Sequence, residues 1–351
     1  MDPEIAVFGC GIAGLESGLR LERKGFEVTI FEPRDSTMFY PALHHIFHGR
    51  EVDDVTIDLE GKFKDRDIEL VNEEVTGMRP EENVVETTSG EWEYRKAVVA
   101  VGSETSYGTI QGEGNVNDLR FRDDAVKIRD HLSGGGIEDV VIVGGGATGV
   151  EAAGSMPDDI DVTVLEAEDR LLPAFPGKIG RTVERSFRSR GIGFRTGAMV
   201  DSIEEDHVVL EGGEKLGSEM TVWAGGVKPN PVLEEFGLPV TEDGVEVDSD
   251  LRAEGEDDVY VAGDAADYEG KVNRAFYAIA EAKTVAENIA RSRNGKDLEK
   301  HRIARDPNLI YMGRWDSLFE MGGLTWRGRI PALMRRFGLE ERYLWTRRHL
   351  L

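Results

Sequence analysis

The feature that most constrains the fold of this chain is a glycine motif placed between two predicted strands. Residues 9–14 read G-C-G-I-A-G and follow the apolar run Ile5–Phe8. A predicted helix continues to about Lys24, and a second predicted strand, 28–31, ends on Glu32. This strand–turn–helix–strand order is typical of half a dinucleotide-binding unit.

Each residue of the motif has a physical task in such a unit. Gly9 permits the tight turn, Gly11 lets the backbone approach a pyrophosphate, and Gly14 lets the helix pack closely on the strand. The start of the helix then offers unpaired N–H groups to phosphates. Glu32 follows Gly14 by 18 residues, where an acidic side chain accepts hydrogen bonds from a ribose.

The same arrangement returns in residues 139–166. Gly144, Gly146 and Gly149 repeat the spacing after an apolar strand, and Glu166 ends the following strand. Two copies of one mechanism predict two nucleotide sites. Glu166 would bond a free ribose 2′-hydroxyl and repel a 2′-phosphate, which favours NAD over NADP, although Arg170 nearby would soften that preference.

The remaining pattern predicts an α/β chain with two Rossmann-like domains, the first interrupted by the second. Short alternating strands between 68 and 100 indicate a β-meander, and two further buried strands end near Gly226 and Gly263. We assign residues 1–108 and 226–300 to the first domain, 109–225 to the second and 301–351 to a C-terminal segment. Asp264, at a strand end among small apolar residues, is interpreted as binding a polyol or ribityl chain, with simple capping as the alternative.

Composition excludes several classes of function. The formal net charge is -26, so nucleic acid is not an expected partner. The same charge suggests a halophilic protein, since high ionic strength screens self-repulsion. Cys10 is the single cysteine, which excludes a redox-active pair. His44, His45 and His48 suggest a metal site, but no carboxylate or cysteine completes a ligand set nearby, so we favour solvated or packed histidines and predict no metal site.

The location is expected to be cytoplasmic. The chain enters its first strand within a few residues, and no apolar run reaches membrane-spanning length.

The C-terminal segment differs in charge from the rest. Residues 301–351 hold ten arginines and five acidic residues, a formal charge of +5, and three of the five tryptophans. We expect a helix lying on anionic lipid, with one apolar side and one arginine side. The alternative is a tail that packs on its own domain or in a homodimer. The apolar side would hold Ile330, Leu333, Met334, Phe337, Leu344 and Trp345, and the headgroup side Arg335, Arg336, Arg342, Arg347 and Arg348.

Taken together, residues 4–290 resemble the two-dinucleotide flavoprotein reductases, which bind FAD in the first fold and NAD(P)H in the second. The resemblance is carried by G-C-G-I-A-G, A-V-V-A-V-G-S, V-G-G-G-A-T-G-V-E, W-A-G-G-V-K-P-N and V-Y-V-A-G-D-A. The stretch Y-P-A-L-H-H-I-F-H-G and the amphipathic tail look like type II NADH:quinone oxidoreductases.

The resemblance implies roles for individual residues. Glu151 would lie near the nicotinamide. FAD would contact Gly9, Gly11, Gly14, Glu32, Pro41, Val75, Gly102, Gly263, Asp264 and Ala275. NADH would contact Gly144, Gly146, Gly149, Glu166 and Gly226. Phe276, Ile279 and Ala280 are candidates for the quinone side, and Phe276 and Ala280 stand where the family often carries glutamines.

The function implied is two-electron transfer from NADH through FAD to a quinone, by an enzyme that could lie peripherally on the inner face of the cell membrane. Three alternatives stay open. One is a soluble NAD(P)H reductase of a small electron carrier such as ferredoxin or rubredoxin. Another is a sulfide:quinone-reductase-like flavoprotein, against which the single Cys10 counts, since those enzymes need paired cysteines. The third is a non-enzymatic flavin redox sensor.

Overall fold

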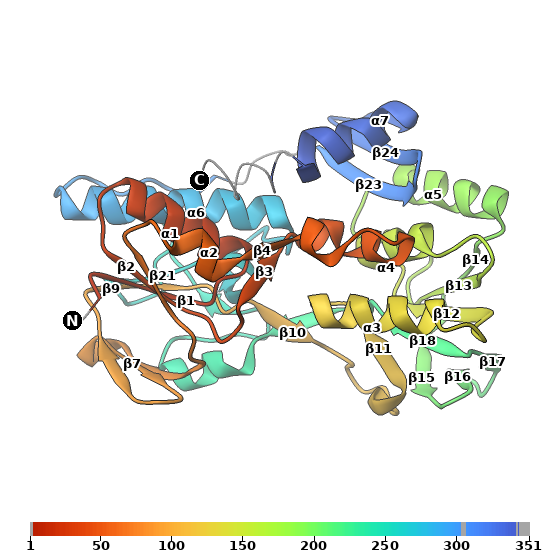
Figure 1. Cartoon of the computed structure of the whole chain (residues 1–351), viewed down its shortest axis with the longest axis horizontal. Helices are drawn as coiled ribbons and strands as arrows, with labels where there is room; N and C mark the ends of the chain where they lie inside the picture. Colours follow the sequence, from red (N-terminus) through yellow and green to blue (C-terminus); the bar gives the residue numbers. More distant parts are fainter. Residues whose placement is uncertain (1–2, 303–306, 342, 344–351) are drawn as a thin grey trace.

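The computed structural model describes residues 3–302, 307–341 and 343, which form two lobes side by side (Figure 1). Each lobe is built on a five-stranded sheet whose strands all run parallel. The first sheet has the strand order β21-β9-β1-β2-β5. Its strands are β1 (Ile5–Phe8), β2 (Val28–Phe31), β5 (Ile68–Val71), β9 (Lys96–Val99) and β21 (Val259–Val261).

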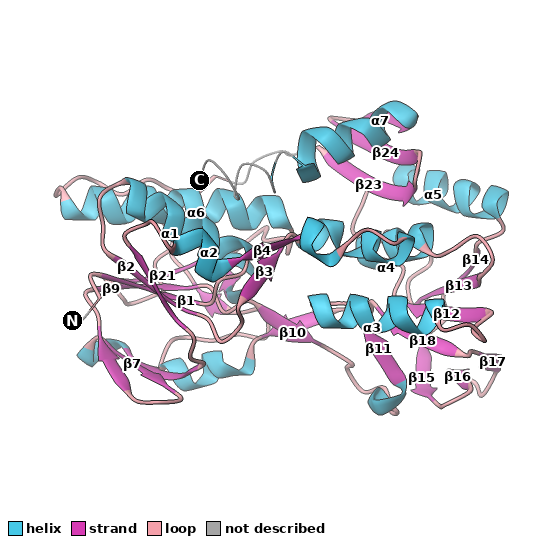
Figure 2. Ribbon diagram, viewed as in Figure 1, coloured by secondary structure: helices cyan, strands magenta, loops and turns pink. Residues whose placement is uncertain are grey.

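The first sheet is assembled from segments far apart in sequence. Ile5 of β1 pairs with Val28 on one side and with Lys96 on the other, and Val259 pairs with Ala97. Every residue of β1 is buried, as the continuous apolar run requires of a central parallel strand. Helices α1 (Ile12–Arg23) and α6 (Ala275–Arg293) lie side by side over this sheet (Figure 2).

The second sheet has the order β11-β18-β12-β13-β14 and is formed entirely by residues between 116 and 223. Helices α3, α4 and α5 flank it in the second lobe (Figure 1). Its elements are β11 (Val116–Asp118), α3 (Arg122–Ser133), β12 (Asp139–Val143), α4 (Ala147–Ser155), β13 (Asp161–Glu166), α5 (Gly177–Arg190), β14 (Gly193–Thr196) and β18 (Met220–Trp223).

A two-stranded antiparallel ribbon, β10 (Ser103–Thr105) with β19 (Val227–Pro229), carries the chain between the lobes. Each lobe also has a small antiparallel meander. These are β6 (Val75–Arg79), β7 (Val84–Thr87) and β8 (Glu91–Glu93) in the first lobe, and β15 (Val200–Ile203), β16 (His207–Leu210) and β17 (Lys215–Gly217) in the second. Because β5 joins the parallel sheet, the predicted meander begins only at Val75.

The remaining short elements lie in the connections between these strands and helices. They are β3 (Ser36–Met38), η1 (Tyr40–His48), η2 (Val52–Asp54), β4 (Thr56–Asp58), α2 (Leu59–Phe63), η3 (Pro80–Glu82), η4 (Glu113–Asn115), η5 (Pro231–Phe236), β20 (Val245–Glu246), η6 (Gly263–Ala265) and β22 (Ala266–Asp267).

Residues 329–341 of the C-terminal segment are helical, as expected, but a sheet that was not predicted precedes them. Residues 308–328 form an antiparallel sheet of β23 (Asn308–Gly313), β24 (Asp316–Met321) and β25 (Leu324–Gly328), followed by α7 (Arg329–Leu333) and the π-helix η7 (Met334–Glu341). Ser317, Leu318 and Glu320 of β24 are buried, whereas β25 has no buried residue. Leu344, Trp345, Arg342, Arg347 and Arg348 lie outside the described residues.

The predicted fold class, α/β with two Rossmann-like units, is confirmed. The first sheet uses residues 5–99 and 259–261, and the second lies between them in sequence, as an interrupted domain would require. The domain boundaries themselves stay a prediction.

Candidate functional site: a cavity between two nucleotide-binding folds

The first glycine loop is shaped for a close backbone approach. Gly9 has φ +90°, and a Cβ there would lie 2.6 Å from the carbonyl oxygen of Ala100. A Cβ on Gly14 would lie 1.9 Å from the carbonyl oxygen of Gly9. A Cβ on Gly11 would meet no atom within 4 Å, and Gly11 lines a cavity. Gly9 and Gly14 are therefore required by packing, and Gly11 leaves space for a ligand.

The second loop repeats this geometry. Gly144 has φ +106°, and a Cβ there would lie 2.3 Å from the carbonyl oxygen of Ala224. A Cβ on Gly149 would lie 1.8 Å from the carbonyl oxygen of Gly144, whereas one on Gly146 would meet nothing within 4 Å. The two motifs therefore share the same loop geometry as well as the same glycine spacing.

Both strand-end acids reach back to their glycine loops. Oε2 of Glu32 accepts the N–H of Cys10 at 2.8 Å, and Oε2 of Glu166 accepts the N–H of Gly145 at 2.8 Å. The Glu32 carboxylate also accepts two bonds from the Arg34 guanidinium, at 2.7 and 3.1 Å. Arg170 donates instead to the carbonyl of Pro173 at 2.6 Å, so its guanidinium is engaged within its own loop.

A cavity of 790 Å³ lies between the lobes, in the upper part of the range of about 300–1,000 Å³ that is usual for ligand sites. Residues of both lobes and of the C-terminal segment line it. It brings together twelve of the predicted site residues: Gly9, Gly11, Glu32, Pro41, Val75, Gly102, Glu151, Gly226, Gly263, Asp264, Ala275 and Phe276.

Other predicted residues do not line this cavity. Gly14, Gly144 and Gly149 pack against backbone, as their glycine identity requires. Gly146 and Glu166 belong to the second loop but lie outside the cavity lining. Ile279 and Ala280, the other two candidates for the quinone side, do not line this cavity, and their role stays a prediction.

Asp264 is held in the cavity wall by residues that sequence reasoning missed. The hydroxyl of Ser103 donates to Oδ2 of Asp264 at 2.6 Å. Nη2 of Arg120 donates to that same hydroxyl oxygen at 2.8 Å and to the Ser103 carbonyl. Arg120 thus holds the Ser103 hydroxyl, and that hydroxyl in turn holds the Asp264 carboxylate.

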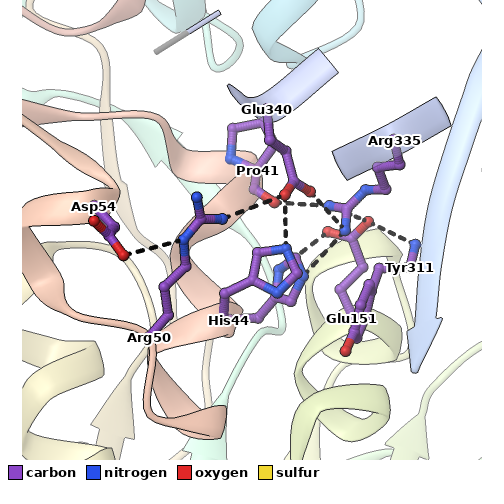
Figure 3. A network of polar contacts seen from close by, with 9 residues as sticks. Pro41, His44, Arg50, Asp54, Glu151, Tyr311, Arg335 and Glu340 are labelled. Atoms are coloured by element: carbon purple, nitrogen blue, oxygen red, sulfur yellow. Dashed lines mark hydrogen bonds and ion pairs between the residues drawn. The ribbon is translucent and has the colours of Figure 1, made fainter. Parts of the chain in front are cut away.

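The second lobe meets the C-terminal segment at Glu151, on the second turn of α4 (Figure 3). Oε1 of Glu151 lies 3.1 Å from Nη2 of Arg335 and accepts the N–H of Tyr311 at 3.1 Å. Nη1 of Arg335 lies 3.1 Å from Oε1 of Glu340, and its Nη2 donates to the Pro41 carbonyl at 2.7 Å. The predicted headgroup position of Arg335 is therefore wrong: the side chain is only 2% exposed.

The histidines join the same cluster. Nε2 of His44 lies 3.1 Å from Nη1 of Arg335. Since a guanidinium can only donate, His44 accepts there, which places its ring proton on Nδ1, 3.8 Å from Oε2 of Glu151. Nε2 of His45 lies 2.8 Å from Oε2 of Glu340, and Arg50 lies 3.7 Å from the same oxygen.

In space, carboxylates do lie close to two of the histidines, which the sequence had not led us to expect. His44, His45 and Glu340 place possible metal-ligand atoms within 4.8 Å of one another. The Arg335 guanidinium contacts both His44 and Glu340 and supplies the positive charge of this cluster. We therefore interpret the cluster as a network of ion pairs. The side chain of His48 lies outside the described part of the chain.

The pKa values of the two acids in this cluster are shifted in opposite directions. Burial raises the pKa of Glu151 above its ordinary value, against the lowering effect of Arg335 and the Tyr311 N–H. Burial also acts to raise the pKa of Glu340, but Arg335, His45 and Arg50 outweigh it and hold that pKa below its ordinary value. Burial raises the pKa of Cys10 well above its ordinary value, so this thiol is not a reactive one.

Apolar side chains gather on the outer surface of the C-terminal segment. Eight large ones are at least 41% exposed: Trp315, Met321, Leu324, Trp326, Ile330, Leu333, Met334 and Phe337. Arg314 lies against Trp315 and Arg336 against Phe337, so cations border this face. We call these eight residues the apolar face. In the described part of the chain, no helix has the length and hydropathy needed to cross a bilayer.

Comparisons with known proteins place this architecture. The sequence pattern of a family described as pyridine nucleotide-disulphide oxidoreductase matches residues 3–282. A type II NADH:quinone oxidoreductase of Staphylococcus aureus is 25% identical over 378 residues, covering 95% of this chain and 93% of its own. A probable NADH dehydrogenase of Dictyostelium discoideum is 26% identical over 309 residues, covering 76% and 68%.

Among solved structures, NDH2 of Plasmodium falciparum in complex with NADH has a TM-score of 0.89 at 18% identity, with 99% of this chain and 96% of that one covered. The sulfide:quinone oxidoreductase of Aquifex aeolicus has a TM-score of 0.87 at 20% identity, with 99% and 91% covered. At these identities the likeness concerns the fold.

Proposed function

The chain belongs to the pyridine nucleotide-disulphide oxidoreductase family, and from this premise we propose that it oxidises NADH and passes two electrons through FAD to a quinone. Family membership confirms the predicted enzyme class, a FAD-dependent oxidoreductase that uses a pyridine nucleotide. The proposal adds the identity of the donor and the acceptor. One observation carries it: a single cavity is walled by both nucleotide folds.

The residues present fit FAD in the first lobe. Gly11 leaves the open approach that a pyrophosphate needs, and Glu32 offers a carboxylate at the end of β2. A ribose there would share Glu32 with Arg34 or displace it. The backbone at Val75 is proposed to contact the adenine, and Asp264, in a polar part of the wall, to contact the ribityl chain.

The second lobe fits a nicotinamide dinucleotide without a 2′-phosphate. Glu166 is buried at the end of β13 and accepts two backbone N–H groups, which hold it as a fixed negative group. No arginine among the described residues pairs with it, and the nearby Arg170 is engaged elsewhere. These contacts support NADH over NADPH.

When bound, the two cofactors supply hydride and electron transfer, and the protein supplies binding and orientation. Glu151 of the second lobe and Pro41 and Ala275 of the first lobe all line this cavity. Burial raises the pKa of Glu151 above its ordinary value, while Arg335 at 3.1 Å acts in the opposite direction. The C-terminal segment, through Arg335, also lines the cavity.

A membrane-bound quinone as acceptor is supported by the apolar face and its arginine border. The proposal places this face on anionic lipid, next to the cavity that the same segment lines. The single buried Cys10 leaves no cysteine pair for sulfide chemistry.

The test has two parts. The purified protein, reconstituted with FAD, should lose its yellow colour when NADH is added without air. It should then turn over NADH with a short-chain quinone much faster than with ferredoxin, rubredoxin or sulfide. Bleaching without quinone turnover would favour a carrier reductase or a sensor, and a protein that stays yellow would refute the proposal.

Membrane contact is tested separately by sedimentation with anionic and with neutral liposomes. The whole chain should sediment with the anionic ones, and a variant with Trp326 and Phe337 both replaced by Ser should stay in the supernatant. Equal sedimentation of both proteins would remove the membrane part of the proposal.

A further inference from the structure

Outside the cavity, a buried ion pair lies directly behind the turn that carries Asp264. Glu281, on α6, is completely buried, and Lys271 is nearly so. Nζ of Lys271 lies 2.6 Å from Oε1 of Glu281. Neither residue lines the cavity, so the pair has no place in the proposed chemistry itself.

Both members of the pair bind the backbone of one residue. The N–H of Gly263 donates to Oε2 of Glu281 at 2.7 Å, and Nζ of Lys271 donates to the Gly263 carbonyl at 2.7 Å. The peptide planes on either side of Gly263 are thus each held by a buried charge. Such charge-assisted bonds are stronger and shorter than neutral ones.

These two hydrogen bonds hold Gly263 in the left-handed backbone region, which residues other than glycine rarely adopt. Gly263 has φ +76°, and a Cβ there would lie 2.9 Å from Cβ of Ala13, on the helix that follows the first glycine loop. Because a peptide bond is planar and trans, fixing the Gly263 carbonyl on Lys271 turns the N–H of Asp264 away from Lys271. The direction of the Asp264 backbone is therefore set from behind the cavity wall.

The pair is itself braced. The hydroxyl of Tyr268 donates to Oε1 of Glu281 at 2.6 Å and lies 3.5 Å from Nε2 of His301. With its three donors, Glu281 is fully satisfied, as a buried carboxylate must be to be tolerated. Stability alone does not explain a buried ion pair, because apolar residues of similar size often stabilise a protein equally well.

We propose that Glu281 and Lys271 are positioning residues for the flavin-binding turn Gly263–Asp264, a role that rests on the proposed FAD site. Ser103 holds the Asp264 side chain from the cavity side, and the ion pair holds its backbone from behind. The two together define where a ribityl hydroxyl would be bound.

The test compares Glu281→Gln with Glu287→Gln, a control on the same helix whose carboxylate forms an exposed pair with Lys24. For each full-length variant, the dissociation constant of FAD and the midpoint potential of the bound flavin are measured at a temperature well below unfolding of the apoprotein. Glu281→Gln should weaken FAD binding by about tenfold or more, the effect that supporting hydrogen bonds have at other bound groups. Its flavin potential should shift, and Glu287→Gln should match the unchanged protein.

If Glu281→Gln does not fold, Tyr268→Phe removes one donor to the same carboxylate and should weaken FAD binding in the same direction. An unchanged FAD affinity and potential, with only the unfolding temperature lowered, would overturn the inference and leave the FAD site standing. An unchanged protein that fails to bind FAD would overturn the proposed function, and this inference with it.

Discussion

The ion pairs of Arg335 give the sharpest test of how the C-terminal segment is attached. We consider Arg335→Met, which keeps much of the side-chain volume and removes the charge. The guanidinium lies 3.1 Å from both Glu151 and Glu340 and donates to the Pro41 carbonyl. The substitution therefore leaves two buried carboxylates and one carbonyl without a shared donor.

The expected loss in free energy of unfolding follows from what remains around each acid. Removing one partner of a buried ion pair costs about 3–5 kcal/mol. Glu340 keeps His45 at 2.8 Å and Arg50 at 3.7 Å, and Glu151 keeps the N–H of Tyr311. We therefore expect the lower end, about 3 kcal/mol.

Urea unfolding followed by tryptophan fluorescence, at one salt concentration and with saturating FAD, measures this loss. Three variants complete a cycle: Arg335→Met, Glu340→Gln and the double substitution. The double variant should be more stable than the sum of the single losses predicts, by about 1–3 kcal/mol, since the two residues contact each other.

Arg336→Met is the matched control, because its side chain is exposed on the same segment. It should change stability by less than about 0.5 kcal/mol. If Arg335→Met behaves like Arg336→Met, the contacts of Arg335 with Glu151 and Pro41 do not hold the segment and our interpretation is refuted. Additive losses at Arg335 and Glu340 would show that this pair within one helix is not coupled.

Four further predictions follow from the site. Glu151→Gln should slow the anaerobic reduction of the flavin by NADH in stopped-flow measurements, and an equal rate would reject a role for Glu151 at the nicotinamide. Glu166→Ala should raise the KM for NADH by about tenfold to a hundredfold, because a charged hydrogen bond contributes about 1.5–3 kcal/mol, and should reduce the preference for NADH over NADPH; unchanged KM values would argue against the ribose contact. The pKa of Glu340 is held below its ordinary value of 4.5, so its contribution to stability is complete above about pH 4.5 and is lost as the pH falls through the pKa of the folded state. The urea midpoint of Glu340→Gln should therefore fall less steeply on acidification than that of the unchanged protein. With a net charge of -26, the protein should lose circular-dichroism structure at low salt and regain it at molar salt, and indifference to salt would remove the halophilic interpretation.

Much of the nucleotide-binding architecture could be read from short stretches of sequence. The strand Ile5–Phe8, the loop of Gly9 to Gly14 and Glu32 lie within thirty residues, and their geometry is decided by local constraints on backbone and packing. The same holds for the second motif. The cavity then collects residues whose places at strand ends were visible in sequence, such as Gly102 and Asp264.

The C-terminal segment shows where this reasoning stops. Ile330, Leu333, Met334 and Phe337 are exposed on consecutive helices as expected, but the sheet before them was not predicted. A pattern of arginines and apolar residues does not reveal which arginine turns inward. Arg335 turns inward because it meets Glu340, five residues on in the same helix, and also Glu151 on α4, which no local pattern links to it.

The sequence by itself therefore determined that this chain has two nucleotide-binding folds, because each is specified by residues close together along the chain. Only the tertiary structure decided how they are joined: Arg335 meets Glu151 across 184 positions and His44 across 291. The Coulomb and hydrogen-bond energies of such contacts depend on distance in space, and periodicity along the chain carries no record of that distance.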